Sequence, residues 1–269
     1  MKQSSLNNAT QMVTKFGDQS PHFLAPDPVD LSRAALLLDV DGTLLEIAAT
    51  PEEVVVPPSL VRTLGQLLER AGGAVALVSG RTIETLDRLF RPLSMPAVGQ
   101  HGAEIRLSPG GPVRCNHASL SPELRRRIHV LATINSRVLV EEKSRSMSVH
   151  FRRAPEYEAF LRQEVAKVVA AEARPDSVEF MFGKAVIDIK PSSFSKGTAV
   201  REVMAAPPFA GRRLVFIGDD TTDESVFAIL PDLGGLGFAV GRNMKAAHGV
   251  FASPAQVRSW LARVAEAAR

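Results

Sequence analysis

Residues 34–43 read AALLLDVDGT, five apolar residues followed by two aspartates one position apart and a glycine. An apolar run this short and unbroken is typical of a strand that is buried on both faces, as in the centre of a parallel sheet. Two later runs have the same character, AVALV (74–78) and LVFI (214–217). The pattern predicts that all three segments are central strands of a parallel sheet.

Helical patterns lie between these strands. In residues 59–70, for example, Leu60, Leu64 and Leu67 fall on one face, and Ser59 is placed to cap the first turn. Strands that alternate with helices in this way predict an α/β fold, a Rossmann-like, doubly wound parallel sheet with helices on both faces.

The middle of the chain breaks this alternation. Helical patterns near 122–134 and 155–173 are mixed there with four strand-like segments, VLVEEK (138–143), MSVHFR (147–152), VEFMFGK (178–184) and AVIDIK (185–190). Hairpin-like strands seldom continue a parallel sheet, so we expect a smaller α+β domain inserted into the first. The expected organisation is a mobile N-terminal extension at residues 1–30, a core domain built from residues 31–107 and 190–269, and an inserted domain at residues 108–189.

The composition is that of an ordinary globular protein. Of the 269 residues, 45% are apolar and 23% are charged, and the formal net charge is only +3, so neither nucleic acid nor a membrane is an expected partner. No segment approaches the roughly 18 consecutive apolar residues of a membrane span, and the first residues lack the apolar stretch of a secretory signal. We expect a cytoplasmic protein that is a monomer or a weak oligomer.

Polar loops follow the three apolar runs. Asp39 to Thr43 follow the first, Ser79-Gly80-Arg81 follow the second, and GDDTTDE (218–224) follows the third. Ligands of an open parallel sheet bind at the carboxyl ends of its strands, so these loops are predicted to meet in one crevice. Clustered carboxylates need a cation between them, and oxygen ligands without cysteine or paired histidine suit Mg²⁺.

The same crevice has the groups that bind phosphate. Asp39 and Asp219 are the natural metal ligands, and Ser79 with the backbone amides around Gly80 can donate hydrogen bonds to an anion. Lys196, in SFSKGT, adds a positive charge. Metal, donors and cation together predict a site for phosphoryl chemistry.

The two aspartates of DVDGT can take different roles. Residues one position apart at the end of a strand point to opposite sides, so Asp39 and Asp41 need not compete. Asp39 can attack phosphorus as a nucleophile, while Asp41, turned outward by Gly42, can protonate the leaving oxygen and later deprotonate water.

These residues resemble the haloacid dehalogenase (HAD) superfamily of phosphotransferases, whose four motifs occur here in order as DVDGT (39–43), Ser79, Lys196 and GDDTTDE. The resemblance implies that Asp39 is the phosphorylated nucleophile and Asp41 the general acid and base. It further implies a HAD-like core, Ser79, Gly80 and Lys196 as phosphate-binding residues, and a Mg²⁺ ion held by Asp39, Asp219 and the backbone carbonyl of Asp41, with Asp220 or Asp223 in support.

A narrower resemblance is to the trehalose-6-phosphate phosphatase family. It rests on five further motifs, VSGR (78–81), GQHGAE (99–104), VEEK (140–143), HFR (150–152) and GKAVIDIKP (183–191). It implies a Mg²⁺-dependent hydrolase that makes trehalose and phosphate through an aspartyl-phosphate intermediate, the last step of trehalose biosynthesis. The inserted domain would then be a mobile C2-type cap whose side chains bind the sugar: Glu141, Lys143, Arg152, Lys184 and Asp188, with Gln100, His101 and Glu104 near the core–cap junction.

Several points stay open at the level of sequence. Asp188 stands where the family motif has glutamate, so its reach to a sugar hydroxyl is one methylene shorter. Arg81 either clamps the substrate or forms a surface ion pair. The core motifs recognise phosphate and metal but no particular sugar, so sucrose 6-phosphate and mannosyl-3-phosphoglycerate are alternative substrates. An alternative function is that of a non-catalytic sugar-phosphate sensor, but the presence of both Asp39 and Asp41 argues against it.

Overall fold

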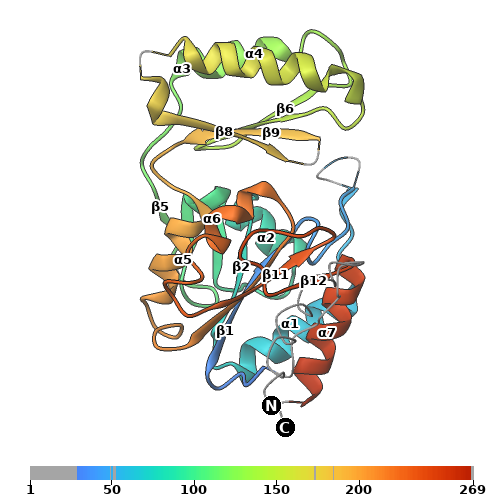
Figure 1. Ribbon diagram of the computed structural model, residues 1–269, viewed down its shortest axis with the longest axis vertical. Helices are drawn as coiled ribbons and strands as arrows, with labels where there is room; N and C mark the ends of the chain where they lie inside the picture. The colour runs from blue at the N-terminus through green and yellow to red at the C-terminus, as the bar shows by residue number, and fades with distance from the viewer. Residues whose placement is uncertain (1–28, 49, 51–52, 173, 184, 268–269) are drawn as a thin grey trace, which may run out of the picture.

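The computed structural model describes residues 29–48, 50, 53–172, 174–183 and 185–267. Most of the predicted N-terminal extension, and Lys184, lie outside the described residues. Two bodies are stacked along the long axis of the molecule (Figure 1). Each body is built around its own β-sheet.

The larger body contains an eight-stranded sheet in the order β12-β11-β10-β1-β2-β3-β4-β5. The strands of this sheet are β1 (Ala34–Asp39), β2 (Val75–Val78), β3 (Ala97–Gly99), β4 (Glu104–Arg106), β5 (Arg114–Cys115), β10 (Arg213–Gly218), β11 (Leu236–Val240) and β12 (Gly249–Phe251). All pairings from β12 to β3 are parallel, and β4 and β5 continue the edge antiparallel. The predicted α/β class with a parallel central sheet is therefore confirmed.

The position of β1 decides where a ligand can bind. From β1 the chain continues outward through β2 and β3 on one side, whereas β10, β11 and β12 extend the sheet on the other side. The carboxyl ends of β1, β2 and β10 therefore meet where the strand order reverses, which is the usual binding crevice of such sheets. The three apolar runs singled out in the sequence are these three strands.

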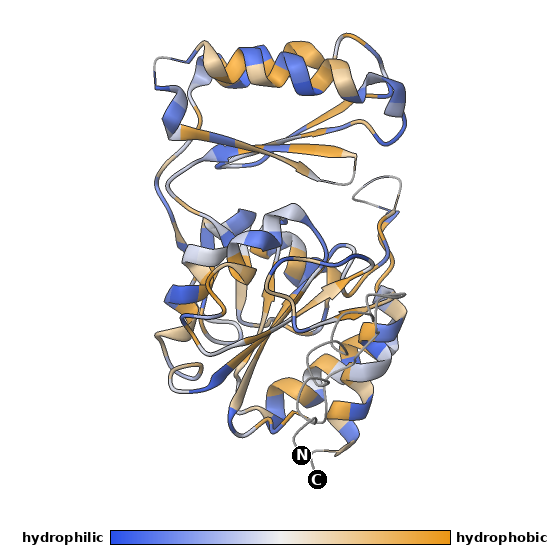
Figure 2. Ribbon diagram, in the orientation of Figure 1, coloured by the Kyte–Doolittle hydropathy of each residue, from blue (hydrophilic) through white to orange (hydrophobic). Residues whose placement is uncertain are grey.

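Helices cover both faces of this sheet. They are α1 (Pro58–Arg70), α2 (Ile83–Leu89), α5 (Lys196–Met204), α6 (Glu224–Phe227) and α7 (Pro254–Ala267). Helices α1 and α7 pack together on one side, and α5 and α6 lie on the other (Figure 1). The strands between them are mainly apolar (Figure 2), and Leu36, Leu37 and Leu38 are completely buried.

One detail of α1 differs from the expectation. Ser59 does not cap the helix: the helix starts one residue earlier, at Pro58, and Pro57 occupies the cap position without a side-chain hydrogen bond. Proline suits the first helical position because its fixed φ matches the helix and the missing N–H would have had no intrahelical partner.

The smaller body, which we call the cap, has a four-stranded antiparallel sheet in the order β6-β7-β9-β8. Its elements are α3 (Pro122–Leu131), β6 (Leu139–Glu142), β7 (Met147–His150), α4 (Glu158–Ala170), β8 (Val178–Gly183) and β9 (Val186–Pro191). The two helices cover the face that points away from the core, so the other face of the sheet looks toward the crevice (Figure 1).

Alternation along the cap strands separates packing residues from site residues. Met147 and Val149 of β7 are buried in the cap's apolar cluster with the helices, as are Ile187 and Ile189 of β9. Side chains at alternate positions point to the opposite face. Ser148, His150 and Asp188 therefore face the core.

The larger sheet continues past residue 108, the predicted start of the inserted domain. Strand β5 still pairs with β4 of the larger sheet, so the chain leaves the core sheet only after Cys115. It returns after β9, which ends at Pro191.

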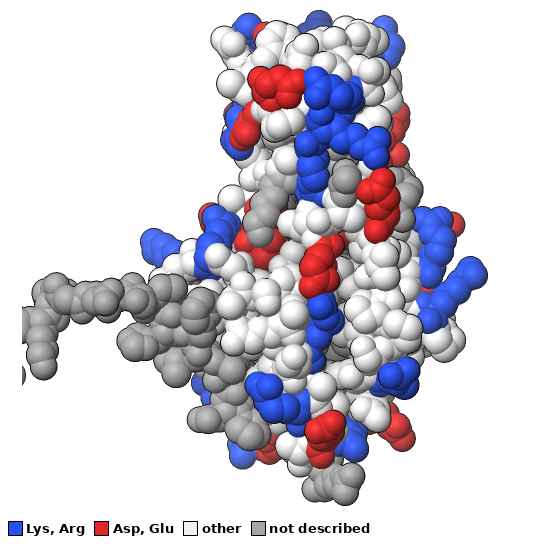
Figure 3. Space-filling view, turned by 90° about the vertical axis from the view of Figure 1, so that its right-hand side faces the viewer, with Lys and Arg blue, Asp and Glu red and all other residues white. Residues whose placement is uncertain are grey.

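None of the helices in the described part of the chain is both long enough and apolar enough to cross a bilayer. On the face shown in Figure 3, basic and acidic side chains are interspersed over both bodies.

Candidate active site

Asp39 lies at the end of β1 in the crevice and is only 4% exposed. Its Oδ1 accepts a hydrogen bond of 2.8 Å from Nζ of Lys196, which also donates to Oδ1 of Asp223 at 2.7 Å. Lys196 is the first residue of α5, directly after the Ser195 cap, whose side chain and that of Thr198 form a capping box. The helix start thus fixes the lysine between the two acids.

Asp223 organises the third loop. Its Oδ2 accepts hydrogen bonds from the backbone N–H of Asp219 at 2.9 Å and of Asp220 at 3.1 Å. Both of its oxygens are therefore used by the protein. Asp223 holds Lys196 and shapes the loop that presents Asp219.

Three buried carboxylates gather here and could hold a metal ion. One oxygen each of Asp39, Asp219 and Asp223 lie within 4.8 Å of one another. Oδ2 of Asp39 is buried without a hydrogen-bond partner among the described residues, which is rare for a buried oxygen. Three acids and one lysine leave two negative charges in excess, and oxygen ligands suit a hard divalent cation.

Glycine is required beside this cluster. Gly42 has a φ of +86°, and a Cβ at this position would lie 2.1 Å from Oδ2 of Asp219. Any side chain would be strained and would also displace the carboxylate. The glycine of DVDGT therefore makes room for Asp219 as well as turning the chain.

The electrostatics of the cluster follow from its burial. Burial and the charge of Asp223 raise the pKa of Asp39 well above its usual value, and Lys196 only partly opposes them. Burial acts to lower the pKa of Lys196, but Asp223 and Asp39 outweigh it, and the net shift is upward. The lysine therefore stays charged, and a cation beside Asp39 would favour its ionised form.

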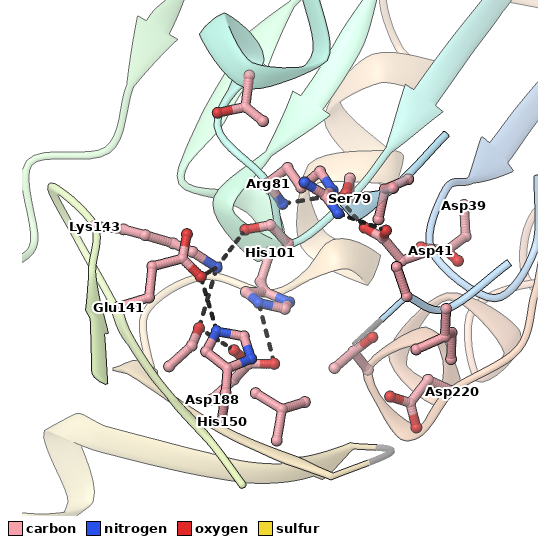
Figure 4. A pocket seen from close by; sticks show the side chains of 18 of the residues that line it. Asp39, Asp41, Ser79, Arg81, His101, Glu141, Lys143, His150, Asp188 and Asp220 are labelled. Carbon is pink, nitrogen blue, oxygen red and sulfur yellow. Dashed lines mark hydrogen bonds and ion pairs between the residues drawn. The ribbon is translucent and has the colours of Figure 1, made fainter. Parts of the chain in front are cut away.

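Asp41 has a different partner from Asp39, as the alternation of side chains predicts. Nε and Nη2 of Arg81 donate to its two carboxylate oxygens at 2.7 and 2.8 Å (Figure 4). The side chains of Arg81 and Asp41 are 13% and 35% exposed, so this is a part-buried bidentate pair rather than a fully exposed surface ion pair. Ser79, completely buried at the end of β2, accepts from the backbone N–H of Arg81 at 3.1 Å.

The cap contributes a polar row that follows from strand register. Glu141 of β6 pairs with Ser148 of β7, which pairs with Asp188 of β9. Directly opposed residues share one face of a sheet, so all three side chains face the core. Ser148 donates to Oδ1 of Asp188 at 2.5 Å and accepts from Nζ of Lys143 at 3.1 Å. His150 lies 2.9 Å from Glu141.

Asp188 is engaged by its neighbours as well. Nε2 of His101, from the core, lies 3.5 Å from its Oδ2 (Figure 4). Burial would raise the pKa of Asp188, but His101, Lys143 and Ser148 outweigh it, and the net shift is downward. Burial lowers the pKa of His101. The shorter aspartate is therefore an ionised acceptor directed toward the cavity.

A cavity of about 470 Å³ joins the two sets of groups. The predicted site residues that line it are Asp39, Asp41, Ser79, Gly80, Arg81, His101, Glu141, Lys143, Arg152, Asp188, Lys196, Asp219 and Asp220. One end holds acids and a lysine suited to phosphoryl transfer, and the other end presents the hydrogen-bonding groups of the cap. Such a cavity suits a phosphorylated polyhydroxyl compound.

Some predicted residues lie elsewhere. Gln100 and Glu104 do not line the cavity; the carboxylate of Glu104 accepts from the backbone N–H of Ile83 at 2.7 Å, at the start of α2. Asp223 lies behind the cavity and holds Lys196. Lys184 is outside the described residues.

Two kinds of lining residue are not predicted from the sequence. Ser148 and His150 could have been found from the alternation in MSVH, which puts both on the face opposite Met147 and Val149. The other kind lines the side of the cavity formed by α2, with Thr85 and Arg88, and by the segment between β1 and α1, with Val54. No local signal marks those residues, because their place depends on how two distant segments pack.

Comparison with known proteins gives one consistent result. The profile of the family described as Trehalose-phosphatase matches residues 37–263. A probable trehalose-phosphate phosphatase of Sinorhizobium fredii is 40% identical over 86% of this chain and 87% of its own length. The trehalose-6-phosphate phosphatase of Escherichia coli is 34% identical over 91% of both chains.

The fold is shared with a solved structure. The C-terminal domain of the C. albicans trehalose-6-phosphate phosphatase superposes with a TM-score of 0.80 over 92% of this chain and 99% of that one, at 22% identity. At that identity the likeness concerns the fold: a core of the same type carrying a cap.

Proposed function

The chain belongs to the trehalose-phosphatase family and is an enzyme of that type, and we propose that it hydrolyses trehalose 6-phosphate to trehalose and phosphate. We further propose that the reaction depends on Mg²⁺, passes through a phosphorylated Asp39 and completes trehalose biosynthesis. The observation that carries the proposal is the single cavity that joins the Asp39–Lys196 pair to the polar row of the cap sheet.

Asp39 and Asp41 divide the chemistry between them. In the first step a carboxylate oxygen of Asp39 forms a bond to phosphorus, the bond from phosphorus to the sugar oxygen breaks, and Asp41 gives that oxygen a proton. In the second step Asp41 takes a proton from water, whose oxygen attacks phosphorus and restores Asp39. Arg81 fixes the orientation of Asp41 for both transfers through its two hydrogen bonds.

The remaining core groups bind and orient the phosphoryl group. Lys196 is directed at Asp39 and so lies where phosphoryl oxygens would come, and the Ser79 hydroxyl and the amide of Gly80 are donors at the end of β2. Asp39, Asp219 and the backbone carbonyl of Asp41 would hold Mg²⁺, with Asp223 in support. The bound ion would supply positive charge against the oxygens of the phosphoryl group.

The cap groups would bind the sugar. Glu141 and Asp188 are acceptors for sugar hydroxyls, and Lys143 and Arg152 are donors on the same side of the cavity. Ser148 compensates in part for the short Asp188 side chain, because its hydroxyl joins Asp188 to Lys143 in one network. A network with fixed geometry can select one arrangement of hydroxyls.

The substrate is tested by phosphate release in Mg²⁺ with trehalose 6-phosphate, glucose 6-phosphate, sucrose 6-phosphate, mannosyl-3-phosphoglycerate and p-nitrophenyl phosphate. We expect kcat/KM for trehalose 6-phosphate to exceed the others by roughly a hundredfold or more, because several desolvated hydrogen bonds distinguish it. An Asp39→Asn preparation is the blank for contaminating phosphatases. Equal rates on all five compounds, or a preference for another sugar, would refute the assigned substrate.

A further inference from the structure

Gln100 is completely buried at the core–cap junction, but it does not line the cavity. It lies in a short helical turn, η2 (Gln100–Gly102), where Gln100 and His101 have φ values of 46° and 56°. Left-handed backbone at two successive residues other than glycine is strained, and the surrounding structure must hold it. The backbone N–H groups of Gln100 and His101 donate to Arg81 O and Ser79 O at 2.8 and 3.0 Å, which ties the turn to the active-site loop.

Both ends of the Gln100 amide cross from the core to the cap. Its Nε2 donates to Oγ of Ser144 at 2.8 Å, and its Oε1 accepts from the backbone N–H of Arg145 at 3.2 Å. The second Nε2 proton goes to Glu104, whose other carboxylate oxygen accepts from Ile83 at the start of α2. The amide thus connects the cap loop at 144–145 to a rigid part of the core.

These bonds matter because polar contacts, and not a shared apolar cluster, join the two bodies among the described residues. Core and cap each have a separate cluster of buried apolar residues. Other polar contacts between core and cap include Lys143 Nζ with Gly80 O at 3.1 Å, His101 with Asp188 at 3.5 Å and Thr221 with Phe182 O at 2.8 Å. Bodies joined in this way are expected to move relative to each other.

The cap loop that Gln100 holds begins next to a cavity residue. Lys143 immediately precedes Ser144, lines the cavity and reaches both Gly80 O and Ser148. Fixing Ser144 and Arg145 against the core therefore fixes the Lys143 ammonium against the end of β2. If the cap moves away from the core, this lysine and the polar row move with it.

We propose that Gln100 is a positioning residue for the closed state: its side-chain amide latches the cap loop at 144–145 to the core and so places Lys143 over the bound sugar phosphate. The inference rests on the proposed function, because only a substrate that spans core and cap needs the closed state. Gln100 acts through Lys143 and touches no reacting atom.

The test replaces Gln100 by methionine, which keeps the length of the side chain and removes both crossing hydrogen bonds together with the bond to Glu104. We expect kcat/KM for trehalose 6-phosphate to fall about tenfold, mainly through KM, since each crossing bond contributes a modest net stabilisation of the closed state. Activity on p-nitrophenyl phosphate, which needs only the core, should stay within about twofold of wild type. Gln163→Met, on the exposed side of α4, is the matched control and should change neither value.

A second variant tests the same contact without a substitution at the buried site, where misfolding could mimic the expected loss. Ser144 is exposed on the cap loop, so Ser144→Ala cannot disturb a core, yet it removes one of the two crossing bonds. It should shift the ratio of the two activities in the same direction by a smaller factor. Small-angle scattering without substrate should give a larger radius of gyration for Gln100→Met than for wild type.

The outcomes separate the two proposals. An unchanged activity ratio in both Gln100→Met and Ser144→Ala, with unchanged scattering, would overturn the latch. If the wild-type protein does not hydrolyse trehalose 6-phosphate at all, the proposed function fails, and scattering from wild type and Gln100→Met still decides whether Gln100 holds the cap closed.

Discussion

Replacing Asp39 by asparagine should abolish turnover, with a fall in kcat of at least about a thousandfold for every phosphate ester. The amide keeps the size of the side chain and the oxygen that accepts from Lys196, but it cannot form the acyl phosphate. Phosphate release under saturating trehalose 6-phosphate and Mg²⁺ measures the effect. Appreciable activity in a preparation free of contaminating phosphatase would exclude Asp39 as the nucleophile.

The same variant should remain folded, and the pH dependence of its thermal midpoint is the control for this. In the metal-free protein, burial and Asp223 raise the pKa of Asp39 above its ordinary value of 3.8. The folded state therefore binds more protons than the unfolded state in the window above pH 3.8, and stability falls as pH rises through it. Asp39→Asn removes this titration. In EDTA, its thermal midpoint should fall less than that of wild type when pH is raised from acidic to neutral.

Removing divalent metal should have the second large effect. Without the ion, Lys196 offsets only one of the three clustered negative charges, so phosphate release in EDTA should fall at least about a hundredfold and return on addition of Mg²⁺. Mg²⁺ should also raise the thermal midpoint of wild type, because it offsets the excess negative charge around Asp39. Asp219→Asn should weaken both effects of Mg²⁺, so that more Mg²⁺ is needed to restore activity.

The neighbouring acid is a matched control for Asp219. Asp220 is bonded through its Oδ1 to the backbone N–H of Thr221 at 2.7 Å and lies outside the carboxylate cluster. Asp220→Asn should therefore keep the Mg²⁺ requirement of wild type. Full activity in EDTA, or a greater loss of Mg²⁺ response in Asp220→Asn than in Asp219→Asn, would contradict the assigned metal site.

The core of the site could be predicted from sequence because parallel sheets gather distant loops in a regular way. Asp39, Ser79 and Asp219 each follow an apolar run, and those runs are adjacent strands whose ends meet. The alternation of side chains also separated Asp39 from Asp41 correctly, since one is held by Lys196 and the other by Arg81.

The rest depends on packing that no local pattern encodes. The pairing of Ser148 with Asp188 depends on the register between two strands that lie 40 residues apart in the sequence. The left-handed conformation of Gln100 is likewise unexpected for a residue other than glycine, and it directs the side chain toward the cap loop instead of the substrate. Helix α1 shows the same limit on a smaller scale, because a serine with good capping chemistry is displaced by prolines beside it.

The most direct test of the account is to trap the intermediate. The Asp41→Asn variant, in which breakdown of an acyl phosphate is slowed, is mixed with trehalose 6-phosphate and Mg²⁺, quenched in acid and reduced with borohydride, which converts an aspartyl phosphate to homoserine. We expect homoserine at position 39, and none when Asp39 is replaced by asparagine in the same background. Phosphate release with position 39 still aspartate at every time point, or modification at Asp219 or Asp223 instead, would contradict it.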